Sequence, residues 1–195
     1  DLAPCTNMWQ WLVGFAERLP DRERGFHKPC GALVCGDTAT GKTLLLRRIA
    51  AEAVKSHTGE LVPLMVDADF VLRALGDTDS ERLKVLSSDF MLTFFCSAYG
   101  EDSKTCLFLR QAMHARRLLL LVDKVEIVSG KLQAPFLTSL AGLVAAGHRV
   151  VATVRTSLSG KDAIPRAIPC HLRTLQVVGL NLRVRSWLAE RSLGQ

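Results

Sequence analysis

Apolar and polar residues form alternating blocks along the chain, and these blocks predict a series of strands and helices. Five short apolar runs have the length and composition of buried strands: 31–35, 61–67, 117–123, 148–154 and 173–180. Apolar residues recur at helical spacing in other segments: 43–57, 80–100, 103–117, 132–147 and 181–193. Strands that alternate with helices and are apolar throughout indicate an α/β fold, in which helices cover both faces of a parallel sheet.

The pattern predicts one domain. The chain has 195 residues, enough for a single full core, and no convincing linker or internal repeat interrupts it. Residues 1–28 are expected to form an N-terminal helix, at 7–19, and a polar loop. Because the sequence opens on Asp1, we expect this single domain, 1–195, to be cut from a longer protein.

The composition favours a reducing, intracellular location. Hydrophobic residues make up 48% and charged residues 23% of the chain, which is ordinary for a globular protein. The apolar runs are far shorter than the ~20 residues of a membrane span, and the first residues lack the pattern of a signal peptide. None of the six cysteines forms a CxxC pair and no histidine cluster supports zinc, so we predict free thiols and a cytoplasmic protein.

The net charge of +6 adds little about partners, because the basic residues are scattered along the chain. A nucleic-acid site usually concentrates basic residues on one face and adds aromatic side chains for stacking. The chain has one tyrosine, Tyr99, and its phenylalanines lie in apolar contexts. We therefore predict solvated helix faces and no specific nucleic-acid partner.

The segment GDTATGKT carries the strongest functional motif. It matches the phosphate-loop pattern G-x-x-x-x-G-K-[ST] in full, and it follows a predicted strand and opens a predicted helix, as the motif requires. Glycine lets the backbone approach phosphate oxygens closely, and successive N–H groups form an anion cradle at the positive end of the helix. The sequence thus predicts a nucleoside triphosphate site at Gly36, Asp37, Thr38, Ala39, Thr40, Gly41, Lys42 and Thr43.

A magnesium site is predicted beside this loop. Lys42 adds a positive charge for the β- and γ-phosphates, and the Thr43 hydroxyl can ligate Mg²⁺. The apolar run LLLLVD ends in Asp123, a carboxylate placed where phosphate-loop proteins bring a second magnesium ligand. Glu126, three residues later, can polarise a water or simply face solvent as a loop residue. Lys124 is unusual, because a cation beside the magnesium carboxylate must point elsewhere or weaken metal binding.

The fourth predicted strand ends in VVATVR, which places Thr153 and Arg155 at its tip. A polar side chain and an arginine at the tip of a central strand can sense the γ-phosphate. The alternative for Arg155 is an ordinary surface arginine.

Together these motifs resemble the NACHT domain, which belongs to the STAND group of signalling NTPases, relatives of AAA+ proteins. The resemblance covers about Ala32 to Ser157 and rests on GDTATGKT, LVPLMVD, LLLLVDKVE and AGHRVVATVRTS. In that family the third strand typically ends in aspartate, a small residue, an apolar residue and two acids. Asp123 and Glu126 match, whereas Lys124 replaces the small residue and Ile127 replaces the final acid.

The resemblance implies a P-loop NTPase fold: a three-layer sandwich whose five-stranded parallel sheet has the order 5-1-4-3-2. It also implies a switch that binds ATP, or less readily GTP, hydrolyses it slowly and self-associates. Protein partners are expected through flanking domains.

Four functions stay open at this point. We adopt a NACHT-like switch that binds a nucleoside triphosphate with Mg²⁺ and hydrolyses it slowly, with Lys42, Glu126 and Arg155 as catalytic residues. Lys124 and Ile127 motivate the second, a nucleotide-binding module that has lost hydrolysis. The third is a small-molecule or nucleoside kinase, for which 159–173 offers few of the arginines of a lid. The fourth is an AAA+-like ATPase that acts on DNA, which the scattered charge disfavours.

Overall fold

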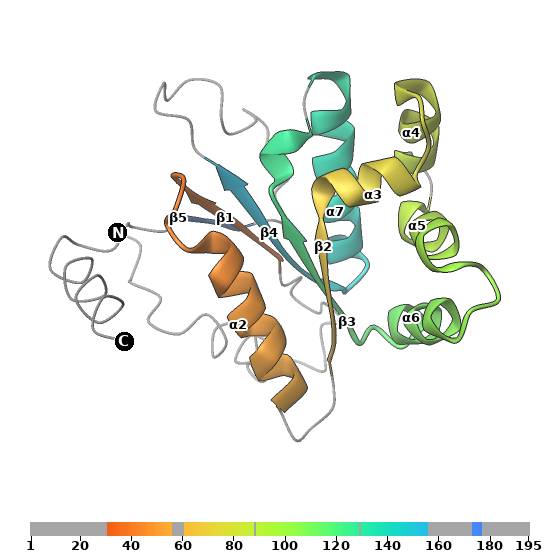
Figure 1. Ribbon diagram of the computed structural model, residues 1–195, viewed down its shortest axis with the longest axis horizontal. Helices are drawn as coiled ribbons and strands as arrows, with labels where there is room; N and C mark the ends of the chain where they lie inside the picture. Colours follow the sequence, from red (N-terminus) through yellow and green to blue (C-terminus); the bar gives the residue numbers. More distant parts are fainter. Residues whose placement is uncertain (1–30, 56–60, 88, 129, 156–172, 177–195) are drawn as a thin grey trace, which may run out of the picture.

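The computed structural model describes residues 31–55, 61–87, 89–128 and 130–155, and the backbone of 173–176. A parallel β-sheet runs through these residues with helices on its two faces (Figure 1). The strands are β1 (Gly31–Gly36), β2 (Val62–Asp67), β3 (Leu118–Asp123), β4 (Arg149–Arg155) and β5 (Arg173–Gln176). The α-helices are α2 (Lys42–Lys55), α3 (Ala68–Ala74), α4 (Asp79–Leu86), α5 (Phe90–Tyr99), α6 (Lys104–His114) and α7 (Gln133–Ala145). Two short 3₁₀ turns follow β3: η1 (Val125–Ile127) and η2 (Gly130–Leu132).

The order of the strands across the sheet is β2-β3-β4-β1-β5. Strand β4 lies between β1 and β3, with Thr153 opposite Val34 and Val150 opposite Leu120. The α/β class, the parallel pairing and the order of β1 to β4 agree with the expectation from the sequence. Only 173–176 of the predicted fifth strand pairs with β1, and 177–180 lie outside the described residues.

The apolar runs form this sheet because both of its faces are covered. Every residue of β3 is buried, and its side chains alternate between two cores. Leu119 and Leu121 pack with Leu46 and Ile49 of α2 on one face. The even-numbered positions of β3 face the larger core, which α3 to α7 cover. A strand buried on both faces needs an apolar side chain at every position, as this sequence provides.

The segment 68–100 differs from the prediction. The single helix expected at 80–100 is two helices, because α4 ends at its cap Ser87 and α5 begins at Phe90. Helix α3 was not expected. Its start is set by Asp67, whose carboxylate accepts a hydrogen bond from the Asp69 amide at 3.0 Å. Asp67 also ends β2, so the sequence pattern indicated the end of a strand at this residue and not the start of a helix.

Two other expectations cannot be compared with the structure. The helix predicted at 7–19 and the helix predicted at 181–193 both lie outside the described residues. Among the helices that are described, none combines the length and the apolar character needed to cross a bilayer.

Phe94 of α5 is predicted to be critical for stability. Its ring is fully buried and lies 5.7 Å from Phe70 and 6.1 Å from Tyr99, both edge-on. We expect Phe94→Ala to lower the free energy of unfolding by about 3–5 kcal/mol, because it leaves a cavity where several rings meet. Phe108→Ala on α6, where the ring is 54% exposed, is the matched control and should cost about 1 kcal/mol or less. Urea denaturation of both variants measures the difference.

Candidate functional site

The loop between β1 and α2 has the backbone shape of an anion cradle. Ala39 and Gly41 both adopt positive φ, at 60° and 87°. A Cβ on Gly41 would meet no atom within 4 Å, so glycine is required there by backbone strain rather than by crowding. The Thr40 hydroxyl donates to the Asp37 carbonyl at 2.8 Å and closes the turn.

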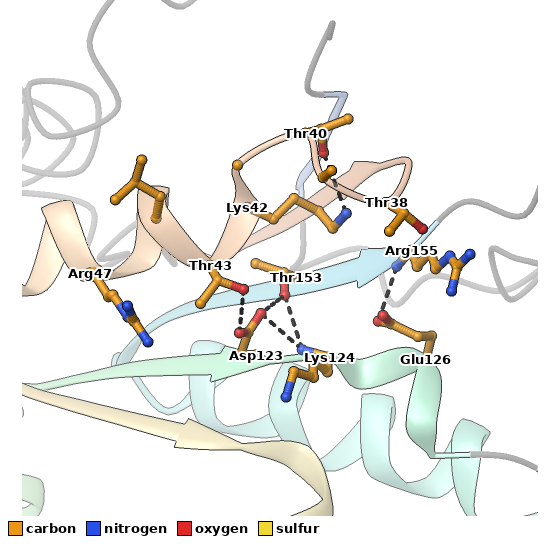
Figure 2. Close-up of a pocket in the computed structure, with 13 residues that line it drawn as sticks. Thr38, Thr40, Lys42, Thr43, Arg47, Asp123, Lys124, Glu126, Thr153 and Arg155 are labelled. Atoms are coloured by element: carbon orange, nitrogen blue, oxygen red, sulfur yellow. Dashed lines mark hydrogen bonds between the residues drawn. The ribbon is translucent and has the colours of Figure 1, made fainter. Parts of the chain in front are cut away.

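Lys42 lies over this loop (Figure 2). Its ammonium group donates to the carbonyl oxygens of Gly36 and Asp37, both at 2.7 Å, and contacts the Thr40 hydroxyl at 3.4 Å. The side chain therefore comes from the first residue of α2 and turns back toward the end of β1. A positive charge is held at the mouth of the loop.

Asp123 lies opposite the loop at the end of β3 and is 5% exposed. Its Oδ2 accepts a hydrogen bond from the Thr43 hydroxyl at 2.7 Å, so the two predicted magnesium ligands are in direct contact. Its Oδ1 accepts from the Thr153 hydroxyl at 2.5 Å and from the Lys124 amide at 3.1 Å. A carboxylate removed from water is stable only when such donors surround it.

Thr153 is completely buried at the tip of β4. Its hydroxyl donates to Asp123 and accepts from the Lys124 amide at 3.0 Å. The sequence suggested a γ-phosphate sensor at this position. In the structure this hydroxyl holds the Asp123 carboxylate, a contact that depends on the tertiary fold. A contact between Thr153 and a γ-phosphate stays a prediction.

The side chain of Lys124 points away from the contact between Thr43 and Asp123 and toward Asp67. Its backbone is left-handed, with φ of 60°, which brings its amide onto Asp123 and Thr153 while its side chain leaves the site. The ammonium pairs with Oδ2 of Asp67 at 2.7 Å. The hydrogen bond that Lys124 donates to Asp67 is the main cause that raises the pKa of Lys124, and the nearby charge of Asp67 adds to it.

Asp67 was not among the predicted site residues. It ends β2 opposite Asp123 in the register of the sheet. One carboxylate oxygen caps α3 and the other binds Lys124. The run LVPLMVD ends in this acid, so the rule that sites gather at the carboxyl ends of parallel strands could have identified it.

Glu126 and Arg155 are brought together, but through the backbone of the arginine. Oε2 of Glu126 accepts a hydrogen bond from the Arg155 amide at 3.0 Å. One oxygen of the proposed water-orienting carboxylate is thus engaged in holding η1 against β4. The guanidinium of Arg155 extends from the exposed end of β4, and Ile127 is 45% exposed.

These residues line a pocket with a volume of about 460 Å³. Thr38 to Thr43 border it, with Asp123, Glu126, Thr153 and Arg155, whereas Gly36 and Asp37 lie at the base of the loop and are not in its wall. Leu44 and Arg47 of α2 also line it and were not predicted, although Arg47 is one helical turn after Thr43. Lys124 also lines the pocket, but its ammonium is paired with Asp67. The other charged residues of the wall are three basic ones, Lys42, Arg47 and Arg155, against Asp123 and Glu126, a balance that attracts an anion.

The donor atoms fit magnesium better than a softer metal. Within the part of the chain that the structure describes, no cluster of three or more His, Cys, Asp or Glu side chains is assembled for a metal ion. The Thr43 hydroxyl and the Asp123 carboxylate are hard oxygen donors. Magnesium is usually held by one or two such groups together with phosphate oxygens and waters, so this small set is sufficient.

Comparison with known proteins identifies the fold. No family model matches the chain, and no curated protein matches its sequence. Solved structures do match. AMPPCP-bound DnaA from Aquifex aeolicus has a TM-score of 0.55 and 17% identity over 95% of this chain and 49% of that one. Domain III of DnaA from Thermotoga maritima gives 0.56 and 16% over 95% and 67%. The Aeropyrum pernix ORC1 protein, solved in complex with DNA, gives 0.51 and 20% over 100% and 50%.

These structures are AAA+ ATPases, and the α/β fold of this chain, with its parallel sheet, is similar to theirs. It spans about half the length of the first of them. At identities of 20% and below, the likeness concerns the fold alone.

Thr153→Val is predicted to destabilise the protein although it preserves the shape of the side chain. It removes a donor to the buried Asp123 carboxylate and an acceptor for the Lys124 amide. We expect the free energy of unfolding to fall by about 1–3 kcal/mol, measured by chemical denaturation. Thr105→Val on the exposed face of α6 should change it by no more than about 0.5 kcal/mol. Equal effects at both positions would contradict an orienting role for Thr153.

Proposed function

We propose that this domain binds a nucleoside triphosphate, ATP more readily than GTP, and acts as a slow Mg²⁺-dependent NTPase switch of the NACHT type. The observation that carries the proposal is the direct contact between Thr43 of the phosphate loop and Asp123 at the end of β3. It joins the two halves of a phosphate and metal site that are 80 residues apart in the sequence. The likeness to a DnaA structure that holds AMPPCP supports ATP as the nucleotide.

Binding would begin with the loop and Lys42. The backbone amides of the loop and the N-terminus of α2 present partial positive charge to the phosphates. The Lys42 ammonium, now on the carbonyls of Gly36 and Asp37, is close enough to exchange these neutral acceptors for charged phosphate oxygens. Charge-assisted hydrogen bonds are stronger than neutral ones, which makes the exchange favourable. Arg47 and Arg155 add attraction at the two sides of the pocket.

The metal would rest on Thr43 and Asp123. Bound magnesium would neutralise phosphate charge and help to place the nucleotide. The protein's part is to hold the Asp123 carboxylate in a fixed direction through Thr153 and the Lys124 amide. Asp67 binds the Lys124 ammonium and holds it away from Thr43 and Asp123, so this cation would not repel a bound metal ion.

The same geometry argues that hydrolysis is slow. Glu126 has one oxygen engaged by the Arg155 amide, so its other oxygen, Oε1, is the one left to orient a water. Ile127 supplies no second carboxylate, and the Lys124 ammonium is paired with Asp67 and does not face the phosphate loop. A long-lived nucleotide complex suits a switch whose bound state holds a conformation or an assembly.

The second candidate is a binding module without hydrolysis. The engaged oxygen of Glu126 favours it, since a carboxylate that fastens η1 to β4 has a sufficient structural reason to be present. The nucleotide would then stabilise a conformation by mass action alone. The two candidates share the binding site and differ only in turnover.

Lys42→Ala is predicted to weaken nucleotide binding by about 10- to 100-fold, because it removes one or two charge-assisted hydrogen bonds to phosphate. Isothermal titration with a non-hydrolysable ATP analogue and Mg²⁺ measures the change. Lys55→Ala removes an exposed lysine at the far end of α2, and this control should leave the Kd unchanged. An unchanged Kd in Lys42→Ala would mean that the nucleotide binds elsewhere.

Glu126→Gln separates the two candidates. The amide oxygen still accepts from the Arg155 amide, so the structure and the Kd should be preserved while the negative charge is lost. If Glu126 orients water, phosphate release should fall by about 10²–10⁴-fold. Phosphate release at background in the unmodified protein, with tight nucleotide binding, would instead establish the binding module.

A further inference from the structure

Two cysteines contact each other where α5 is followed by α6. Figure 1 shows both helices well away from the loop between β1 and α2. Cys96 is on the last turn of α5 and Cys106 on the first turn of α6, and their sulfurs are 3.9 Å apart. Cys106 is fully buried, whereas Cys96 is half-buried. Cys96 is therefore the less buried residue of the pair, and the Cys106 sulfur lies next to its sulfur.

The backbone around the pair favours close approach. Gly100 ends α5 with φ of 82°, and its amide donates to the Cys96 carbonyl at 3.0 Å. The Ser103 hydroxyl accepts from the Cys106 amide at 3.0 Å and caps α6. A disulfide has an S–S length of about 2.05 Å, so the sulfurs must approach by roughly 2 Å. Rotation of the Cys96 side chain on the last turn of its helix can provide much of this movement.

We propose that Cys96 and Cys106 form a reversible regulatory disulfide by exchange with a low-molecular-weight disulfide such as glutathione disulfide. Cys96 loses its proton to water and its sulfur attacks one sulfur of glutathione disulfide, which releases one glutathione thiolate. Cys106 then loses its proton, and its sulfur attacks Cys96 and releases the second glutathione. Two cysteine thiols are oxidised, and one glutathione disulfide is reduced to two molecules of glutathione.

The order of these steps follows from the surroundings of the two thiols. Burial is the main cause that raises the pKa of Cys106, and the hydrogen bond with Cys96 raises it further. Cys106 therefore stays protonated and protected until a mixed disulfide forms beside it. The positive charge of Arg110 favours the Cys106 thiolate when the second step requires it.

Cys35 provides a control within the same chain. It is buried in β1, its sulfur contacts the Leu33 carbonyl at 3.8 Å, and burial raises its pKa to about 11. A thiol with these properties should not react while the chain is folded. Modification of Cys35 thus reports unfolding rather than the proposed exchange.

The disulfide would join the end of α5 to the start of α6 around a short loop. Closing a loop of this length should raise the Tm of the oxidised protein by about 5–10 °C over the reduced form. Helix α5 packs on α3, and α3 packs on η1, which carries Glu126. The disulfide would therefore stiffen the helical layer next to the site. Its formation needs no nucleotide, so it can be tested whether or not the proposed NTPase activity exists.

The test is equilibration of the folded chain in glutathione buffers of increasing disulfide fraction, followed by acid quenching, alkylation and non-reducing tryptic mass mapping. Trypsin cleaves after Lys84, Lys104 and Arg110, so the disulfide joins peptides 85–104 and 105–110. We expect this linked pair to grow with the disulfide fraction, to vanish with dithiothreitol and to leave Cys35 alkylated.

Two single variants complete the experiment. Cys106→Ala should stop at a glutathione adduct on Cys96, and Cys96→Ser should leave Cys106 unmodified. The proposal is overturned if the unmodified chain accumulates only the Cys96 adduct, if both thiols stay free, or if linked peptides appear only together with modified Cys35. Melting of each variant in reducing buffer verifies that it is folded before oxidation.

Discussion

The structure depends on the placement of one buried carboxylate. Asp123 sits at the end of a strand that is apolar on both faces, and its charge is tolerated because Thr43, Thr153 and the Lys124 amide all donate to it. These donors come from α2, β4 and the turn after β3. In the strand order β3-β4-β1, the carboxyl end of β3 lies next to that of β4 and near the start of α2. The Asp123 carboxylate can therefore accept hydrogen bonds from both.

The departures from the acidic pattern at the end of β3 have a consistent physical explanation. A lysine beside a magnesium carboxylate would compete with the metal if its side chain turned inward. The left-handed backbone of Lys124 directs its amide into the site and its ammonium out of it, where Asp67 receives it. Because Asp67 also caps α3, the same ion pair connects the candidate site to the helical layer over the larger core. An exposed ion pair of this kind contributes little to the free energy of unfolding. Its main effect is to fix the direction in which the Lys124 side chain points.

Much of the fold was predictable because its strands are covered on both sides. The predicted runs 31–35, 117–123 and 148–154 correspond to β1, β3 and β4, and the predicted phosphate-loop segment spans the connection from β1 to α2. The helices at 68–100 were less predictable. Asp67 both ends a strand and starts a helix, and the break at Ser87 carries no glycine or proline to mark it. The sequence did not predict Leu44, Arg47 and Asp67 as site residues, because their position at the site depends on neighbouring elements.

The sequence by itself determined the element types and the chemistry available, since hydrophobic periodicity and the phosphate-loop spacing are local properties of the chain. Only the tertiary structure decided what the polar residues do. It placed the Thr153 hydroxyl on the Asp123 carboxylate, the Glu126 carboxylate on the backbone of β4 and the Lys124 ammonium on Asp67. The physical reason is that a polar side chain acts through the donors and acceptors it meets, and these lie 29 to 57 residues away along the chain.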